Sequence, residues 1–360
     1  MKAIFFISIS LILFYSSLSN GEDYVGWTVG GACNGYGSVF GTINSGTTWS
    51  RQGSNQIVNA DLSGVFAVDP KTAWAVGRVE SGYATIYNTK DGGTTWHRKG
   101  FGQTALQGIS LGKVHVSSNN IWAIGKNAIL RSSNNGEFWT NCIPSQYTNI
   151  LLQGLFSIDG NTVWVSGEGI STSDFAVMLK TTDAGQNWKR QIGGAISNAT
   201  HLLGISAANT QTLWAVGGED YNVLRSDNGG NSWIRQPSNG GFGDANEVFA
   251  VDTQTVWVAV DPDIEWTNDG GFSWTNKTTL NYTMGICAVN KKEVWSAVRD
   301  PLHNLGYIYH TSNGGENWDV QIFTNSPFWT ISFAQQSIPE PFYLSFIIYQ
   351  LLFIIYLRRK

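Results

Sequence analysis

The sequence is poor in cysteine, proline and charge. Its 360 residues include three cysteines and eight prolines, and only 13% of them are charged. Three widely spaced cysteines argue against a disulfide framework, and neither a CxxC pair nor a histidine-rich run suggests zinc. The formal charge of −4 is not the basic footprint that binding to a phosphate backbone requires. We therefore expect no metal, no cofactor and no nucleic-acid partner.

Glycine and aromatic residues, by contrast, are abundant. The chain contains 41 Gly, 16 Trp, 13 Tyr and 18 Phe, a composition that suits short strands joined by tight turns. A chain of this length has room for two domains, but all-β propellers and barrels often reach this size as a single domain. The composition therefore favours an all-β fold.

The first 21 residues predict export. Met1 and Lys2 are followed by an apolar run from Ala3 to Tyr15 and then by small residues. A basic start, an apolar stretch of this length and small residues at its exit are typical of a secretory signal peptide. We predict that residues 1–21 are removed and that the remaining chain is exported.

The last 24 residues predict a second targeting segment. Residues 338–341 read Ile-Pro-Glu-Pro, the apolar stretch Phe342–Leu357 follows, and the chain ends in Arg-Arg-Lys. The apolar stretch would span about 24 Å as a helix, slightly less than a hydrocarbon core.

This order of features resembles the PEP-CTERM sorting signal of Gram-negative bacteria. The resemblance implies a transient anchor in the inner membrane, cleavage by an exosortase-type processing enzyme, and delivery to the outer envelope or the extracellular space. The alternative is that residues 337–360 form an ordinary membrane anchor.

An eight-residue pattern recurs seven times between these two segments. It has Ser or Thr first, Asn or Asp third, Gly fifth and Trp eighth. The Asn or Asp side chain can fold onto nearby backbone N–H groups, the Gly supplies a positive φ, and the Trp packs on a neighbouring strand or blade. The third residues are Asn44, Asp91, Asn134, Asp183, Asn228, Asp269 and Asn313, and the eighth are Trp49, Trp96, Trp139, Trp188, Trp233, Trp274 and Trp318.

The spacing of this pattern predicts the fold. Successive patterns lie 41 to 49 residues apart, which is the period of four-stranded propeller blades. A second Trp precedes each pattern in a short apolar run, such as residues 72–77, and many repeats have another apolar run before that. We interpret these as strand B and the innermost strand A, with the pattern in the hairpin between strands C and D.

The first blade lacks an A strand of its own, whereas residues 328–333 form a spare apolar run after the last pattern. Placing this run in the first blade closes the ring and removes an exposed sheet edge. We predict an all-β, seven-bladed propeller over residues 22–336, with four-stranded blades and a C-terminal strand that joins the first blade.

The eight-residue pattern resembles the Asp-box or BNR repeat. A Trp-Ala-Val-Gly strand followed by such a box, as in residues 74–77 and 89–96, also resembles the propellers of photosystem II assembly and stability factors. The resemblance covers about residues 22–335 and implies the propeller fold. It implies no particular activity, because sialidases, xyloglucanases and sorting receptors also carry the box. We interpret the box residues as structural.

Loop lengths single out one face of the predicted ring. From the strand-B Trp to the next box there are 15 to 17 residues in blades one, two, four and seven, but 10 to 12 in the others. We therefore expect inserts between strands B and C, and those of blades seven, one and two would lie side by side. Loops on a rigid scaffold often carry binding residues, although these inserts would also suit a merely solvated rim. The candidate binding residues are Tyr36, Arg78, Glu80, Tyr83, Arg299, Asp300, His303 and Tyr307.

The sequence favours binding over catalysis. Sialidases need an arginine triad and a Tyr nucleophile, whereas arginines are few here, and xyloglucanase-type hydrolases place paired carboxylates across two propellers. The densest acidic cluster, Asp261, Asp263 and Glu265, would suit a cation site, an acid pair or simply a turn. We predict a non-catalytic propeller that contacts exopolysaccharide or a protein partner. The alternative is a sialidase- or xyloglucanase-like glycoside hydrolase.

Overall fold

The computed structural model describes residues 23–33, 36–58, 60–147, 149–169, 176–218, 222–237, 244–280 and 282–335. The predicted signal peptide and sorting segment lie outside these residues. No helix within the described ranges is long and apolar enough to cross a membrane.

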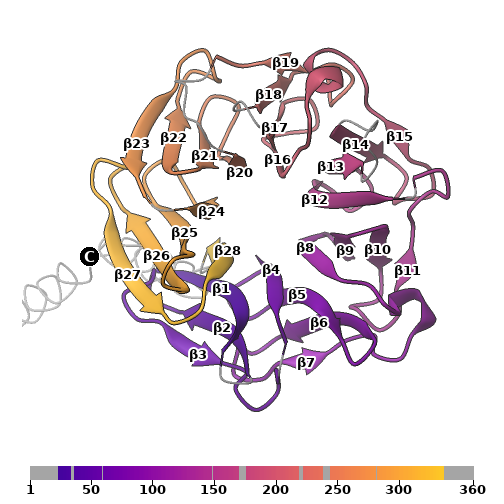
Figure 1. The fold of residues 1–360 in the computed structure, drawn as a ribbon, viewed down its shortest axis with the longest axis vertical. Coiled ribbons are helices and arrows are strands. Elements are labelled where there is room, and N and C mark those ends of the chain that lie inside the picture. The colour runs from indigo at the N-terminus through magenta and orange to yellow at the C-terminus, as the bar shows by residue number, and fades with distance from the viewer. Residues whose placement is uncertain are drawn as a thin grey trace, which may run out of the picture. The chain divides into compact units, whose positions relative to one another are not determined.

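Seven four-stranded antiparallel sheets form the blades of a propeller (Figure 1), which confirms the predicted fold class. In each blade the first-named strand below is innermost. Blade 1 consists of β28 (Phe328–Gln335), β1 (Tyr24–Cys33), β2 (Tyr36–Thr42) and β3 (Ser50–Gln52); blade 2 of β4 (Leu62–Ala67), β5 (Ala73–Glu80), β6 (Tyr83–Thr89) and β7 (His97–Arg98); and blade 3 of β8 (Leu111–Ser117), β9 (Asn120–Gly125), β10 (Ala128–Ser132) and β11 (Thr140–Asn141).

The remaining blades follow the same order. Blade 4 consists of β12 (Ile150–Ser157), β13 (Val163–Gly169), β14 (Ala176–Thr181) and β15 (Lys189–Arg190); blade 5 of β16 (Gly204–Ala207), β17 (Leu213–Gly217), β18 (Asn222–Ser226) and β19 (Ile234–Arg235); blade 6 of β20 (Ala245–Ala250), β21 (Val256–Val260), β22 (Asp263–Thr267) and β23 (Thr275–Thr279); and blade 7 of β24 (Thr283–Ala288), β25 (Val294–Asp300), β26 (Leu305–Thr311) and β27 (Asp319–Thr324). Two short 3₁₀ turns, η1 (Thr104–Leu106) and η2 (Ala195–Asn198), lie in loops between blades.

The predicted ring closure is confirmed. Strand β28 takes the innermost place in blade 1 and pairs with β1, so the two ends of the propeller meet in one sheet. Thr28 Oγ1 donates a 2.8 Å hydrogen bond to the backbone oxygen of Thr330, and Phe328 is fully buried. The first residues of β1 lie beside the last residues of β28, because a Cβ at Gly26 would meet the ring of Phe333.

Tryptophan pairs join every blade to the next. Each of the seven buried hydrophobic clusters contains the strand-B Trp of one blade and the eighth-position Trp of the following blade. Where the rings touch they meet edge to face, as Trp74 and Trp139 do at a centroid distance of 6.4 Å, an arrangement that aromatic quadrupoles favour. The pairs are Trp27 with Trp96, Trp74 with Trp139, Trp122 with Trp188, Trp164 with Trp233, Trp214 with Trp274, Trp257 with Trp318, and Trp295 with Trp49.

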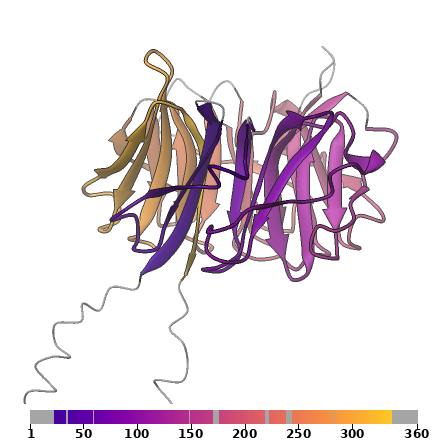
Figure 2. The ribbon, with the colours of Figure 1, turned by 90° about the horizontal axis from the view of Figure 1, so that it is seen from below.

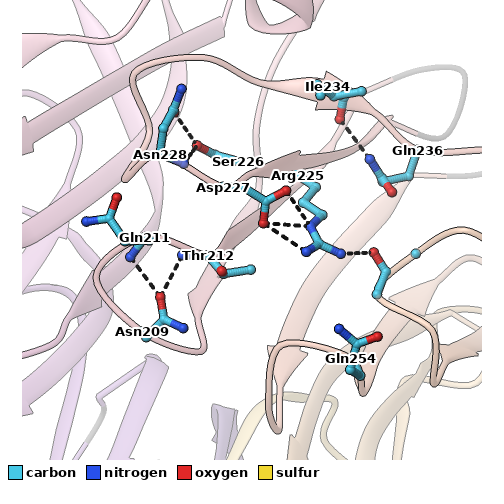
Figure 3. A network of polar contacts seen from close by, with 12 residues as sticks. Asn209, Gln211, Thr212, Arg225, Ser226, Asp227, Asn228, Ile234, Gln236 and Gln254 are labelled. Carbon is cyan, nitrogen blue, oxygen red and sulfur yellow. Dashed lines mark hydrogen bonds and ion pairs between the residues drawn. The ribbon is translucent and has the colours of Figure 1, made fainter.

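The eight-residue patterns form turns with a shared hydrogen-bond network, which we call repeat turns. In blade 5, Ser226 Oγ donates to Asn228 Oδ1 at 3.0 Å and accepts the N–H of Gly230 at 2.9 Å. Asn228 Oδ1 also accepts the N–H of Ser232 at 2.9 Å. Figure 3 shows this turn, together with Arg225, which binds Asp227 and donates to a backbone oxygen in blade 6. The polar residues of this turn are therefore occupied in holding the backbone.

The fifth-position glycine of each repeat turn has a second role besides its positive φ. It packs against the preceding blade. Its neighbour there is either the strand-B Trp of that blade or the residue three positions after the repeat-turn Trp of that blade. A Cβ at Gly136 would lie 2.6 Å from the ring of Trp74, and one at Gly185 would lie 2.8 Å from Trp122. These glycines thus permit the close approach of adjacent blades.

Replacing Gly136 by Ala tests this second role. Gly136 has φ +77° and no room for a methyl group, whereas Gly82 has φ +83° and nothing within 4 Å of a Cβ. We expect Gly82→Ala to cost about 1 kcal/mol for the left-handed backbone. We expect Gly136→Ala to cost about 1 to 3 kcal/mol more, because the buried indole must shift. Urea denaturation of the two variants measures the difference, and equal losses would contradict the close-approach role.

Candidate functional site

The candidate site is a cavity of about 430 Å³ at the end of the central channel where the innermost strands begin. We call it the mouth. Five innermost strands, β4, β8, β12, β20 and β24, each carry a β-bulge at this end. The extra residues of these bulges all line the mouth, and they are Ser63, Gly112, Gln153, Asn246 and Met284. Bulges redirect side chains. The same kind of bulge, repeated in five inner strands, therefore places these five residues at the mouth.

The floor of the mouth is an ion pair that joins opposite sides of the channel. The ammonium group of Lys113 on β8 contacts the carboxylate of Glu247 on β20, and these two side chains are 24% and 16% exposed. Lys113 also lines a second cavity of about 110 Å³ deeper in the channel, together with Glu247. The pair therefore lies between the mouth and this deeper cavity.

Aromatic rings line the deeper cavity below the ion pair. His115 lies between Phe66 and Phe156, with ring centroids 4.3 Å and 4.9 Å away. Burial lowers the pKa of His115 to about 3, so the imidazole is neutral at pH 7. These side chains therefore give the deeper cavity an aromatic wall, and a ligand that enters from the mouth meets the ion pair first.

Charged side chains of both signs lie around the opening of the mouth. Asp61 accepts the N–H of Ala32 at 2.7 Å and forms a 3.7 Å ion pair with Arg78. Lys126 and Trp329 also line the mouth, and Lys126 makes no ion pair within the described ranges. The described residues of the opening thus offer cations, a carboxylate and one indole ring.

The structure distributes the predicted binding residues over several places. Arg78 lines the mouth, and Arg299 stacks on Trp329 with its guanidinium carbon 5.1 Å from the ring centroid. Asp300 and His303 form a 2.7 Å contact in the hairpin between β25 and β26.

Glu80, Tyr83 and Tyr307 do not line the mouth. Glu80 forms a 3.1 Å ion pair with Arg98, and Tyr83 packs on Phe101. Tyr307 packs on Phe323 in the outer strand of blade 7. Tyr36 begins β2, opposite Cys33, and its side chain lies outside the described part. The predicted residues whose side chains are described therefore do not line one cavity, because Arg78 lines the mouth and the others do not.

The extra residues of blades 1, 2 and 7 lie mostly in paired strands and not in long loops. The hairpin of blade 2 is paired out to Glu80 and Tyr83, and that of blade 7 out to Asp300 and Leu305. Cross-strand hydrogen bonds take up the added backbone groups, so the inserts extend strands B and C. The insert of blade 4 includes residues 170–175, outside the described ranges.

The acidic residues of blade 6 do not converge on one point. Asp263 accepts a 2.7 Å hydrogen bond from Thr279 Oγ1, whereas Glu265 is buried. Burial, followed by the nearby charge of Asp263, raises the pKa of Glu265 to about 7. Burial also raises the pKa of Asp261. Across the described ranges, no group of three potential metal-ligating side chains occurs.

Sequence reasoning missed the bulge residues and the ion pair of Lys113 with Glu247. One signal was present. In three innermost strands the bulge residue directly precedes a glycine, in the pairs Ser63-Gly64, Gln153-Gly154 and Met284-Gly285. The partnership of Lys113 with Glu247 left no comparable signal, because it joins blades 3 and 6 across the ring.

A double-mutant cycle tests the ion pair in the floor. We expect Glu247→Leu alone to cost about 2 to 3 kcal/mol, because Lys113 then keeps a poorly solvated charge. The double replacement Lys113→Met with Glu247→Leu should cost less than the sum of the two single replacements, since it leaves no unpaired charge. Urea denaturation gives the coupling energy, and a value near zero would show that the two groups do not depend on each other.

These features define the class of protein: a seven-bladed β-propeller whose channel mouth has the volume of a ligand pocket. A family model described as "Photosynthesis system II assembly factor YCF48" matches residues 65–198, just over a third of the chain. No curated protein matches the sequence.

Solved structures of similar fold include two propellers of that name. "YCF48 bound to D1 peptide" is 16% identical with a TM-score of 0.54, over 72% of this chain and 81% of that one. YCF48 from Cyanidioschyzon merolae is 18% identical with a TM-score of 0.52, over 72% and 84%. The GH74 xyloglucanase from Xanthomonas campestris is 13% identical with a TM-score of 0.55, over 88% and 55%. At these identities the likeness shows the fold alone.

Proposed function

We propose that this chain is an exported, non-catalytic binding propeller whose mouth holds an extended segment of a protein partner. The observation that carries the proposal is the mouth itself, a cavity of about 430 Å³ built on five bulged inner strands. A cavity of this size accommodates a few residues of an extended peptide. Backbone-anchored polar side chains such as Asn246, which donates to the backbone oxygen of Thr283 at 3.0 Å, give it a fixed shape.

The acidic groups of the mouth argue against glycoside hydrolysis. That reaction uses two carboxyl groups on opposite sides of the scissile bond. Among the described residues that line the mouth, Asp61 is the single carboxylate, and it is held by Ala32 and Arg78. Glu247 lies in the floor and pairs with Lys113. A binding role requires no such carboxylate pair.

The comparisons support a peptide ligand over a polysaccharide. The family match and the fold likeness both involve proteins named YCF48, and one of these is described as bound to a peptide. The GH74 likeness shares the fold, but among the described residues that line the mouth one, Trp329, has an aromatic ring on which a sugar could stack.

Filling the mouth tests the proposal. Gly112 lines the mouth and has nothing within 4 Å of a Cβ, so Gly112→Trp blocks the cavity without a clash at its Cβ. The probes are an array of 15-residue peptides that tile the exported and membrane proteins of the source cells, and an array of polysaccharides. We expect peptides to bind the native protein and to lose binding to Gly112→Trp. The matched control is Gln186→Trp on an exposed repeat turn.

Two outcomes would contradict the peptide-binding role. Binding of polysaccharide alone would favour the exopolysaccharide ligand, and peptide binding that survives Gly112→Trp would place the site elsewhere.

Export is tested separately by mass spectrometry of the mature protein from fractionated cells. A chain that begins near residue 22 and ends near residues 339–341, found in the outer envelope or the medium, supports export and processing by an exosortase-type enzyme. An intact end at Lys360 in the inner membrane supports a permanent anchor.

A further inference from the structure

Arg299 occupies a distinctive place on the rim of the mouth. It lies near the end of β25, where its N–H donates a 3.0 Å hydrogen bond to the backbone oxygen of Tyr282. Its guanidinium group stacks over the ring of Trp329, and Trp329 lines the mouth. Arg299 thus lies between the mouth and the hairpin that joins β25 to β26.

The charge of Arg299 is not taken up by an ion pair. Arg78 pairs with Asp61 and Arg98 pairs with Glu80, whereas the ion pairs of the described residues include none with Arg299. Asp261 is near enough for Arg299 to lower its pKa, but burial has the larger effect and the net shift is upward.

A stacked guanidinium group keeps its in-plane N–H donors for a further partner. These donors match the two oxygens of a carboxylate. Arg299 is therefore set up to receive a carboxylate from outside the chain.

The hairpin beside Arg299 holds an apolar side chain out into solvent. Asp300 Oδ1 accepts the N–H groups of Leu302 and His303 at 3.0 Å and 3.2 Å, and its second oxygen contacts His303 Nδ1. These bonds fix the tip of the hairpin, yet Leu302 is 89% exposed and Tyr282, next to Arg299, is 50% exposed. Figure 2 shows this hairpin, in gold, rising above its face of the ring.

Exposed apolar residues held rigidly next to an unpaired arginine are typical of a binding surface. Tyr, Trp and Arg are the residues that most often dominate binding energy at interfaces. A fixed hairpin also loses little conformational freedom when it binds. Two independent features of blade 7, the positive charge of Arg299 and the exposed side chain of Leu302, thus favour a partner that carries both a carboxylate and an apolar side chain.

We propose that the strip of Trp329, Arg299, Tyr282 and Leu302, which we call the rim strip, binds an acidic, extended peptide. A carboxylate of the peptide pairs with Arg299 across the face of Trp329, and an adjacent apolar side chain packs on Tyr282 and Leu302. This inference rests on the proposed function and names the chemistry of its partner: an extended segment that alternates acidic and apolar residues.

A pair of short peptides tests the rim strip. The probes are fluorescein-labelled, capped peptides with the repeat Leu-Asp-Glu-Leu and with its neutral isostere Leu-Asn-Gln-Leu, and fluorescence polarisation measures their binding. We expect the acidic peptide to bind the native protein more tightly than the neutral one. Arg299→Gln should weaken the acidic peptide about tenfold or more, as loss of a charged hydrogen bond predicts, with little effect on the neutral peptide. Leu302→Ser should weaken both.

The control is Lys90→Gln, which removes an exposed positive charge in the repeat turn of blade 2. Equal binding of both peptides, unchanged binding by Arg299→Gln, or no binding of the acidic peptide would overturn the inference. Each variant is checked by thermal unfolding, so that loss of binding is not confused with loss of fold.

The same variants separate this inference from the proposed function. Peptides from the array that lose binding to Gly112→Trp but keep it with Arg299→Gln would retain the mouth as a binding site and reject the rim strip. Loss with Arg299→Gln alone would reject the mouth and retain the rim strip.

Discussion

A propeller that ends at Pro327, and therefore lacks β28, is expected to be unfolded or aggregated at 25 °C. Strand β28 buries Phe328, Ile331 and Phe333, and burial of three large apolar side chains contributes about 5 to 9 kcal/mol. This is comparable to the whole net stability of a typical domain. Loss of the strand also leaves β1 as an open inner edge, which favours pairing with other chains.

Size-exclusion chromatography and urea denaturation of the shortened and the full propeller measure this effect. A synthetic peptide that covers residues 326–335 is expected to restore the monomeric fold, because it supplies the missing strand in trans. The matched peptide with Phe328→Ser and Phe333→Ser should fail to do so. An unchanged denaturation midpoint in the shortened chain would show that ring closure contributes little to stability.

Acid is expected to destabilise the propeller through His115. The folded pKa of about 3 lies below the ordinary value of 6.5, so the unfolded chain binds the proton first as the pH falls. The stability that His115 contributes is therefore complete above pH 6.5 and is lost progressively as the pH falls toward 3. Each pH unit between the two pKa values lowers the free energy of unfolding by about 1.4 kcal/mol. The expected loss is therefore about 2 to 3 kcal/mol between pH 6.5 and pH 4.5.

Glu265 acts in the opposite direction over the same range. Its folded pKa of about 7 lies above the ordinary value of 4.5, so its contribution falls as the pH rises from 4.5 to 7. The acid effect of His115 is therefore best measured in a Glu265→Gln background. Adding His115→Phe, which keeps an aromatic ring between Phe66 and Phe156, should flatten the dependence of the free energy of unfolding on pH. An unchanged dependence on pH in the His115→Phe variant would contradict the prediction.

The propeller was predictable because its determinants repeat along the chain. The repeat turns depend on contacts within eight residues, such as those of Ser226 with Asn228 and Gly230. The buried tryptophans mark each blade at a regular period. Ring closure followed from counting, because one blade lacked an inner strand and Phe328–Gln335 supplied it.

The candidate site was not predictable to the same degree because its determinants lie far apart in sequence. A bulge at Asn246 depends on its pairing with β21, and the partnership of Lys113 with Glu247 depends on the diameter of the ring. The inserts were recognised by length, but length alone does not separate a loop from an extended hairpin such as the one that ends at Asp300 and Leu305. Arg78 and Arg299 were identified as candidates, whereas the mouth that they flank was not.

The closure of the ring also decides how the propeller responds to mechanical force. The start of β1 lies beside the end of β28, so a force that separates Tyr24 from Ala334 acts across these two strands. In an antiparallel pair the hydrogen bonds run perpendicular to the strands, so such a load breaks them one after another and not all at once. Under tension blade 1 would therefore open first, before any of the six blades that are formed from one continuous stretch of chain.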